Sequence, residues 1–247
     1  MPRLSVIIIT LNEERNLRRC LESVRFADEI VLYDTGSTDR TLEIAREFNC
    51  RILEMAFSGF GIAKQKALDA ATGDWVLSID ADEELDEELQ RAVQAAIAGG
   101  EHAGYELVRK SQFLGRWIMH SGWYPDRILR LFQREQARFT DARVHERAVV
   151  DGSVGQLTGH MLHYTYGDIS QYLKKMDQYS SLSALTLHKD GRRFATSQLL
   201  VKPPAYFVKM YLLKSGWRDG LPGLILALLS SFHELVKFAK LWEVERR

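Results

Sequence analysis

The sequence predicts an α/β fold, with a Rossmann-like, mainly parallel sheet that carries helices on both faces and a helical C-terminal extension. In the first hundred residues, short apolar runs rich in β-branched side chains alternate with segments of helical periodicity. Repeated strand–helix–strand units of this kind produce parallel sheets that are covered on both faces. From Leu221 onward, apolar residues recur at helical spacing, which predicts the extension.

The elements of the first half follow in order. Leu4 to Thr10 is an apolar run typical of a strand, and Asn12 can cap a helix from Glu13 to Val24. Ser37 or Thr38 can cap the next helix. The remaining predicted elements are strands at 29–34, 51–55 and 74–79 and helices at 41–48, 63–71 and 87–97.

Composition limits the class of protein. The chain has 247 residues, of which 46% are hydrophobic, so we expect a globular protein of one or two domains. Its net charge is zero, and we expect no nucleic-acid partner. Cys20 and Cys50 have no metal-binding spacing and are expected to be reduced fillers in a cytosolic protein. Met1-Pro2-Arg3 leads straight into a strand pattern, which does not fit a signal peptide.

Polar residues gather where the predicted strands end. Thr10 to Glu13, Asp34, and the pair Asp80 and Asp82 all follow strands, and ligands of parallel sheets bind beyond the carboxyl ends of the strands. Asp80 and Asp82 are two positions apart, so an extended backbone points both carboxylates the same way. Such oxygen donors suit Mg²⁺ or Mn²⁺ carrying a diphosphate, although Asp-x-Asp also marks ordinary solvated strand ends.

These residues carry a resemblance to a known family. The segments 5–14, 31–41, 63–68 (Ala-Lys-Gln-Lys-Ala-Leu) and Asp80-Ala81-Asp82 resemble, in order, the opening half of family 2 glycosyltransferases with the A-type fold. Phe113-Leu114-Gly115 and the segments 122–127, 144–146 and 163–164 further resemble the branch that includes lipopolysaccharide inner-core β-glucosyltransferases. The flanks of Asp34, Tyr33 and Thr35, depart from the usual pattern, but the aspartate itself is kept.

The resemblance implies a site for a UDP-sugar donor. Its expected residues are Thr10, Asn12, Glu13, Asp34, Lys64 and Asp80, with Asp34 contacting the uracil and Asp80 the ribose. Simpler interpretations stay open. Asp34 can be a turn aspartate, Asn12 only a helix cap, and Lys64 a solvated helix lysine.

The resemblance also implies a divalent metal and a catalytic base. Asp82 and the late histidine His163 are the expected ligands of Mg²⁺ or Mn²⁺, which would stabilise the leaving diphosphate, and His163 can instead be a structural histidine. Glu146 is the expected base for inverting transfer, and its alternative is a surface ion pair with Arg143 or Arg147. Glu83 and Glu84 are expected to open the helix at 87–97.

An acceptor site is predicted around the turn-like, aromatic segment Gly122 to Asp126. Trp123, Tyr124 and Asp126 are the candidates, with Trp117 beside them, because aromatic faces stack on sugar rings. Both tryptophans can equally belong to the core, since the following segment, 127–132, alternates like a half-buried strand. Arg127 and Arg130 are either diphosphate ligands or ordinary outer-face charges.

The domain prediction places a catalytic domain at 1–195, with a nucleotide-binding half up to about residue 100 and an acceptor half at 101–195, and a basic helical tail at 196–247. The tail has eight Lys and Arg against four acids, and Lys202 to Arg218 mixes cations with aromatic residues, as lipid-surface segments do. Leu221 to Leu229 is the longest run free of polar residues, too short to span a membrane. The tail helix either packs on the catalytic domain or lies in the plane of a membrane.

The expected function is therefore inverting, metal-dependent transfer of a hexose from a UDP-sugar to a lipid-linked glycan such as the lipopolysaccharide inner core. Glucose is the favoured hexose. The expected location is the cytoplasmic face of the inner membrane, with an anionic lipid surface as partner. Two alternatives are transfer to polyprenyl phosphate and, from another class, a non-catalytic nucleotide-sugar-binding membrane scaffold. Loss of the metal or base carboxylates would favour the scaffold, and Asp80, Asp82 and Glu146 are all present.

Overall fold

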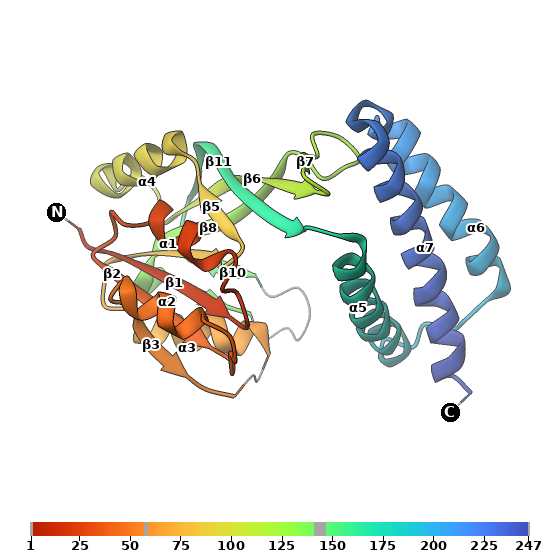
Figure 1. Cartoon of the computed structure of the whole chain (residues 1–247), viewed down its shortest axis with the longest axis horizontal. Coiled ribbons are helices and arrows are strands. Elements are labelled where there is room, and N and C mark those ends of the chain that lie inside the picture. Colours follow the sequence, from red (N-terminus) through yellow and green to blue (C-terminus); the bar gives the residue numbers. More distant parts are fainter. Residues whose placement is uncertain (1, 57–58, 141–146, 247) are drawn as a thin grey trace. The chain divides into compact units, whose positions relative to one another are not determined.

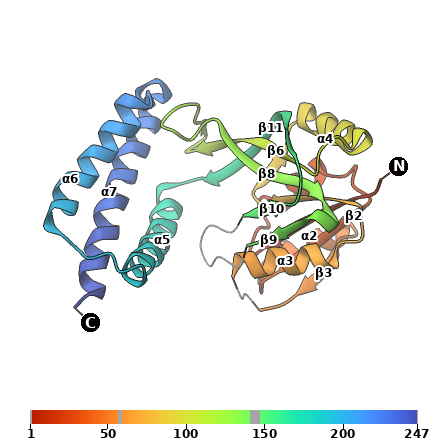
Figure 2. The same cartoon turned by 180° about the vertical axis from the view of Figure 1, so that it is seen from behind.

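The structure is a computed structural model that describes residues 2–56, 59–140 and 147–246 (Figures 1 and 2). It divides into two compact units. Unit 1 comprises Met1–Arg109 and Asp126–His163, and unit 2 comprises Lys110–Pro125 and Tyr164–Arg247. The predicted boundary at residue 195 falls inside unit 2, and the assignment of catalysis to residues 1–195 stays a prediction.

Unit 1 is built on a mixed sheet. Four strands pair in parallel in the order β3-β2-β1-β4, which confirms the predicted parallel half, and antiparallel strands continue the sheet as β8-β6-β11-β5. The bounds are β1 Leu4–Thr10, β2 Glu29–Asp34, β3 Arg51–Glu54, β4 Trp75–Asp80, β5 Glu83–Leu85, β6 Gly104–Phe113, β8 Asp126–Gln133 and β11 Val154–Tyr166. A short pair, β9 Ala137–Phe139 with β10 Ala148–Val150, is antiparallel.

Four helices accompany this sheet: α1 Leu17–Ser23, α2 Thr41–Glu47, α3 Phe60–Ala70 and α4 Glu87–Gly99. Two predicted caps are wrong. Asn12 does not cap α1, because residues 14–16 form a turn and the helix begins only at Leu17, with Asn16 before it. Neither Ser37 nor Thr38 caps α2, because Asp39 Oδ1 accepts the backbone N–H of Thr41.

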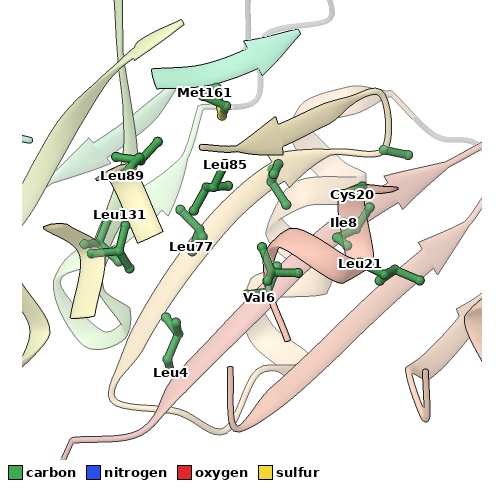
Figure 3. Close-up of a cluster of buried hydrophobic side chains, with 14 of the residues drawn as sticks. Leu4, Val6, Ile8, Cys20, Leu21, Leu77, Leu85, Leu89, Leu131 and Met161 are labelled. Atoms are coloured by element: carbon green, nitrogen blue, oxygen red, sulfur yellow. The ribbon is translucent and has the colours of Figure 1, made fainter. Parts of the chain in front are cut away.

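The two faces of the parallel strands bury alternate residues. Val6 and Ile8 of β1 lie in one core with Leu21 of α1 and Leu89 of α4 (Figure 3), whereas Ile7 packs with α3 on the other side. Each such aliphatic side chain contributes about 1.5–3 kcal/mol when fully buried. Burial also raises the pKa of the Cys20 thiol, and of the Cys50 thiol to about 12, so both free cysteines are packing residues with little thiolate.

Unit 2 is mainly helical. It contains β7 Arg116–Trp117, α5 Ile169–Lys189, α6 Thr196–Phe207 and α7 Gly220–Val244. A π turn, Val208–Leu213, and a 3₁₀ turn, Gly216–Asp219, connect α6 to α7, which lie side by side (Figure 1). The predicted tail helix is confirmed as α7, whose Leu226 and Leu241 are fully buried against the neighbouring elements of this unit.

One expectation about the tail needs correction. Residues 216–244 have a mean hydropathy of 1.4 and form a helical segment long and apolar enough, by length and composition only, to cross a membrane. The unbroken apolar run ends at Leu229, but Ser230, Ser231 and His233 interrupt it without adding charge. The same helix packs along α5 and α6, but only 28% of its most apolar 18-residue window is buried.

Candidate active site

The carboxyl ends of β1, β2 and β4 meet at one edge of the sheet. Thr10 of β1 stands in register with Asp34 of β2, and Ile9 stands in register with Asp80 of β4. Because β1 lies between β2 and β4, Thr10, Asp34 and Asp80 share that edge. The convergence predicted from the strand ends is therefore observed.

Asp34 is buried in a dense set of hydrogen bonds. Thr10 Oγ1 donates to its Oδ1 at 3.0 Å, and the backbone N–H groups of Gly36 and Ser37 donate to its Oδ2 at 2.9 and 2.8 Å. Burial alone would raise the pKa of this carboxyl, but the bonds from Ser37, Gly36 and Thr10 outweigh burial and lower it. This geometry fits the turn interpretation, and the uracil contact stays a prediction.

Asn12 and Glu13 connect two loops at this edge. Asn12 has a left-handed backbone (φ 56°), its Oδ1 accepts the Thr38 N–H at 2.8 Å, and its own N–H donates to Ser37 Oγ at 2.9 Å. The Glu13 N–H donates to Thr41 Oγ1 at 2.8 Å. Both residues thus hold the loop after β1 against the loop after β2.

Asp80 is held by two cationic side chains. Arg130 Nη2 lies 2.7 Å from its Oδ2 and Lys64 Nζ lies 3.2 Å from its Oδ1. Burial alone would raise the pKa of Asp80, but the charges of Arg130 and Lys64 hold it well below its usual range. Lys64 is itself buried, so it is not the solvated helix lysine of the simpler interpretation.

Glu83 extends this network, contrary to the expectation that it opens a helix. Its side chain is fully buried in β5, its Oε2 accepts the Asp80 N–H at 2.8 Å, and Arg130 Nη2 lies 3.3 Å from both of its oxygens. Arg109 Nη1 lies 3.4 Å from Glu83 Oε1. Arg109, which no sequence pattern singles out, therefore belongs to the same charge cluster.

A signal for Glu83 was present in the sequence. Glu83 and Leu85 are alternate residues of the short strand β5, and both are buried. A carboxylate in phase with an apolar strand residue points inward with it. Helix α4 instead starts at Asp86, whose Oδ1 accepts the Leu89 N–H at 2.8 Å.

Asp82 and His163 are brought together as predicted. His163 Nε2 lies 3.4 Å from Asp82 Oδ2, and each side chain is 15% exposed. The pairing of β5 with β11 brings the two side chains together, because His163 stands opposite Glu83, the residue after Asp82. A carboxylate oxygen and an imidazole nitrogen suit Mn²⁺ or Mg²⁺. Within the described ranges no third His, Cys, Asp or Glu joins them.

The predicted acceptor residues fall in both units. Asp126, in unit 1, accepts hydrogen bonds at its Oδ2 from Arg109 Nε at 2.9 Å and Nη2 at 2.7 Å. Trp123, in unit 2, is half-buried and packs edge-on against Phe113, with ring centroids 6.2 Å apart. Tyr124 is half-buried and precedes Pro125 through a cis peptide bond. Trp123 is thus in contact with the core, and the sugar-binding roles stay predictions.

The remaining candidates separate clearly. Arg127 is exposed, whereas Arg130 is buried, because residues three apart on a strand face opposite sides of the sheet. Arg127 is therefore the outer-face charge and Arg130 the inward one. Trp117 packs edge-on against Tyr164, with centroids 5.3 Å apart. Glu146 lies outside the described residues, and its role as base stays a prediction.

Comparison with known proteins adds independent findings. The sequence model described as Glycosyl transferase family 2 matches residues 5–151. The lipopolysaccharide core biosynthesis glycosyltransferase LpsC of Rhizobium meliloti is 32% identical over 97% of this chain and 92% of its own length. An uncharacterized glycosyltransferase of Rickettsia typhi is 30% identical over 99% of this chain and 88% of its own.

Similar solved structures have low sequence identity. Residues 1–349 of S. aureus TarS align with a TM-score of 0.49 at 16% identity, over 99% of this chain and 91% of that one. Glucosyl-3-phosphoglycerate synthase from Mycobacterium tuberculosis, in complex with Mn²⁺, UDP-glucose and phosphoglyceric acid, aligns with a TM-score of 0.39 at 21% identity, over 55% and 57% of the two chains.

Proposed function

This chain belongs to glycosyl transferase family 2 and is a glycosyltransferase with the A-type α/β fold, and we propose that it transfers a hexose, glucose first, from a UDP-sugar to a lipid-linked glycan. The lipopolysaccharide inner core is the proposed acceptor. It is supported by the 32% identity to LpsC, a protein named for lipopolysaccharide core biosynthesis, over nearly the whole chain.

The observation that carries this proposal is the charge cluster at the sheet edge. Asp80 is ionised and is held by Lys64 and Arg130. Asp82, two residues after Asp80, lies beside His163. An Asp80 carboxylate locked in one orientation can accept hydrogen bonds from a ribose without reorganising. The loops joined by Asn12 and Glu13 border the same edge and would line the nucleoside.

We assign the metal site to Asp82 and His163. A divalent cation bound there would supply positive charge to the diphosphate as the sugar departs. The residues of the chain have separate tasks. Arg130 and Lys64 keep Asp80 charged and fixed, and buried Glu83 accepts the Asp80 N–H, which restrains the backbone two residues before Asp82.

Inverting transfer also needs a base on the acceptor side. We assign this role to Glu146, which would take the proton of the acceptor hydroxyl as its oxygen attacks the anomeric carbon and the bond to the diphosphate breaks. Asp126 is the reserve candidate, and its Oδ2 is occupied by two hydrogen bonds from Arg109. Those bonds favour Glu146 over Asp126.

The proposed location is the cytoplasmic face of the inner membrane, where a lipid-linked acceptor presents its glycan. Support comes from the basic tail and from the similarity to LpsC. Polyprenyl phosphate is the second acceptor class, because it would be reached from the same surface.

The test is a transfer assay followed by mass spectrometry of the glycolipid. The purified protein is incubated with Mn²⁺, a panel of nucleotide sugars, and either truncated lipopolysaccharide or polyprenyl phosphate. We expect truncated lipopolysaccharide to gain the mass of one hexose with UDP-glucose, and the Asp82→Ala protein to give no product. Modification of polyprenyl phosphate alone would replace the inner-core acceptor, and no product with any donor would refute the proposal.

A further inference from the structure

The connection between α6 and α7 exposes several large apolar side chains. We call residues 208–221 the elbow; it contains the π turn, the 3₁₀ turn and the first residues of α7. Its large apolar side chains include some of the most exposed in the chain, with exposed fractions of 43% for Val208, 56% for Leu212, 75% for Leu213, 56% for Trp217 and 67% for Leu221. A contiguous stretch of this kind in water is unfavourable and marks an interaction site.

The exposed charged side chains of the elbow are all positive. Lys209, Lys214 and Arg218 are exposed between the apolar residues. Asp219 is the one acid of the segment, and it is buried. Apolar side chains mixed with a tryptophan and cations are the composition of segments that lie at the interface of a lipid bilayer, where the cations meet anionic headgroups.

Asp219 anchors the elbow to another segment of unit 2. Its carboxylate accepts the backbone N–H of Met119 at 3.1 Å and that of His120 at 3.0 Å, and it lies 3.0 Å from His120 Nδ1 and 3.3 Å from Ser121 Oγ. Lys214 O accepts the Ser121 N–H at 2.9 Å. The elbow therefore holds residues 119–121, which are separated from Trp123 and Tyr124 by Gly122 alone.

The turn itself is closely packed. A Cβ added at Gly223 would lie 2.2 Å from Gly216 O, and one added at Gly216 would lie 2.7 Å from Ser121 Oγ. The start of α7 thus touches the 3₁₀ turn with no room for a side chain. The exposed apolar residues are consequently presented by an ordered turn.

We propose that the elbow inserts its apolar side chains into the surface of an anionic phospholipid bilayer, with Lys209, Lys214 and Arg218 at the headgroup phosphates. Asp219 then keeps the predicted acceptor segment at the membrane surface. The second step rests on the proposed function, because it gives Trp123 and Tyr124, both in unit 2, a lipid-borne acceptor. The sequence alone left open whether the tail helix packs on the catalytic domain or lies in the membrane plane, whereas the structure packs α6 with α7 and leaves large apolar side chains exposed in the turn between them.

The experiment is flotation of the full chain with phosphatidylcholine vesicles that contain or lack phosphatidylglycerol. One variant, Leu213→Ser/Trp217→Ser, removes apolar anchors, and a second, Lys209→Glu/Arg218→Glu, reverses charge. Their matched controls are Leu182→Ser/Leu185→Ser on α5, about 45% exposed, and Arg192→Glu/Arg193→Glu in the exposed turn before α6. We expect each elbow variant to lower the partition coefficient onto anionic vesicles at least tenfold, and each control to change it less than twofold.

Two further measurements separate this proposal from the proposed function. Lipids brominated on the acyl chain should quench the fluorescence of wild-type protein, and Trp217→Phe should lose that quenching. Elbow variants should keep UDP affinity and turnover on a deacylated, water-soluble acceptor, and lose at least tenfold with the acceptor in vesicles. Vesicle binding through the elbow without sugar transfer from any donor would refute the proposed function and leave the docking surface standing.

Four outcomes would overturn the docking surface. The first is wild-type protein that ignores anionic vesicles. The second is equal release of elbow and control variants. The third is a dimer in light scattering that the elbow variants dissociate, because the occupant would then be a second copy. Resistance to extraction at alkaline pH would also contradict it, since α7 would then span the bilayer.

Discussion

The strand edge of unit 1 and the elbow of unit 2 differ in which side chains they expose to water. At the edge, charged side chains are withdrawn from water and paired, with Glu83 fully buried against Arg130. At the elbow, apolar side chains such as Leu213 are left in water while the single acid, Asp219, is buried. The first arrangement suits a charged, water-soluble ligand, and the second suits an apolar solvent.

The charge cluster has a further implication for the donor. Its three cations, Lys64, Arg109 and Arg130, are matched by three carboxylates, Asp80, Glu83 and Asp126. Burying an unpaired ion costs several kcal/mol, so the cluster is stable because it is balanced. A bound diphosphate would add negative charge, and these three cations do not neutralise it because they are already paired with carboxylates of the protein. This balance is a physical reason to expect a divalent cation at Asp82 and His163.

The largest expected effect tests that reason. Asp82→Ala should lower the transfer rate by about 10³ or more, several kcal/mol of transition-state stabilisation, because a metal ligand is lost. EDTA should abolish wild-type transfer, and the thermal unfolding midpoint of the variant should stay near that of wild type. Full activity of Asp82→Ala in the presence of chelator would refute metal assistance and with it the argument from charge balance.

The second prediction asks whether the base belongs to the segment around residue 146. Glu146→Gln keeps the side chain's shape but cannot take a proton, so the turnover number should fall by about 10² or more. UDP affinity, measured by calorimetry, should remain near the wild-type value. Arg147→Gln is the control, because it would remove a surface ion pair of Glu146 with Arg147 and leave the carboxylate in place. Normal turnover of Glu146→Gln would instead direct attention to Asp126.

A third prediction concerns the buried centre of the charge cluster. Glu83→Gln leaves Arg130 and Arg109 without their shared carboxylate, and removing one partner of a buried pair costs about 3 kcal/mol or more. Glu84→Gln is the matched control, because Glu84 is 27% exposed and lies 3.4 Å from Arg19, where about 0–1 kcal/mol is expected. Urea unfolding measures both. Equal, small effects would mean that Glu83 is not an organising residue.

The fourth prediction follows from the lowered pKa of Asp34. Its carboxylate is more acidic in the folded chain than in the unfolded chain, so its bonds stabilise the fold above the ordinary pKa near 3.8, and that stability is lost as pH falls through the folded value. Asp34→Asn should cost about 1 kcal/mol at pH 7, and the difference from wild type should shrink below about pH 4. A difference independent of pH would contradict the hydrogen-bond account.

The parallel strands could be predicted from the sequence because their signals are local. β1 and β2 begin and end where the apolar runs do, and the pair Asp82 and His163 was found through motif order. Helix starts were less accurate. Asparagine is a common helix-capping residue, but the Asn12 Oδ1 instead accepts the Thr38 N–H. Only the pairing of β1 with β2 brings Thr38 near.

The long-range pairings could not be predicted. Arg109 contacts Glu83 only because β6 lies in the same sheet as β5 and β8, and nothing in the sequence near Arg109 marks it. Asp219 looked like one acid in a basic tail, yet its partners lie about a hundred positions earlier in the chain. Side chains whose role depends on distant strands or turns need the fold itself.

The smallest expected effect tests the other half of the comparison, namely that the elbow's apolar residues do not stabilise the fold. Leu213→Ser and Trp217→Ser should each change the free energy of unfolding by less than about 0.5 kcal/mol in the absence of lipid, because these side chains are largely solvated already. Leu226→Ala, at a fully buried position of the adjoining helix, should cost about 2–5 kcal/mol in the same urea titration. A loss above about 2 kcal/mol in either elbow variant would place these side chains in the packing of unit 2. Their exposure would then need no membrane to explain it, and the contrast between a charged edge built for a soluble donor and an apolar turn built for lipid would fail.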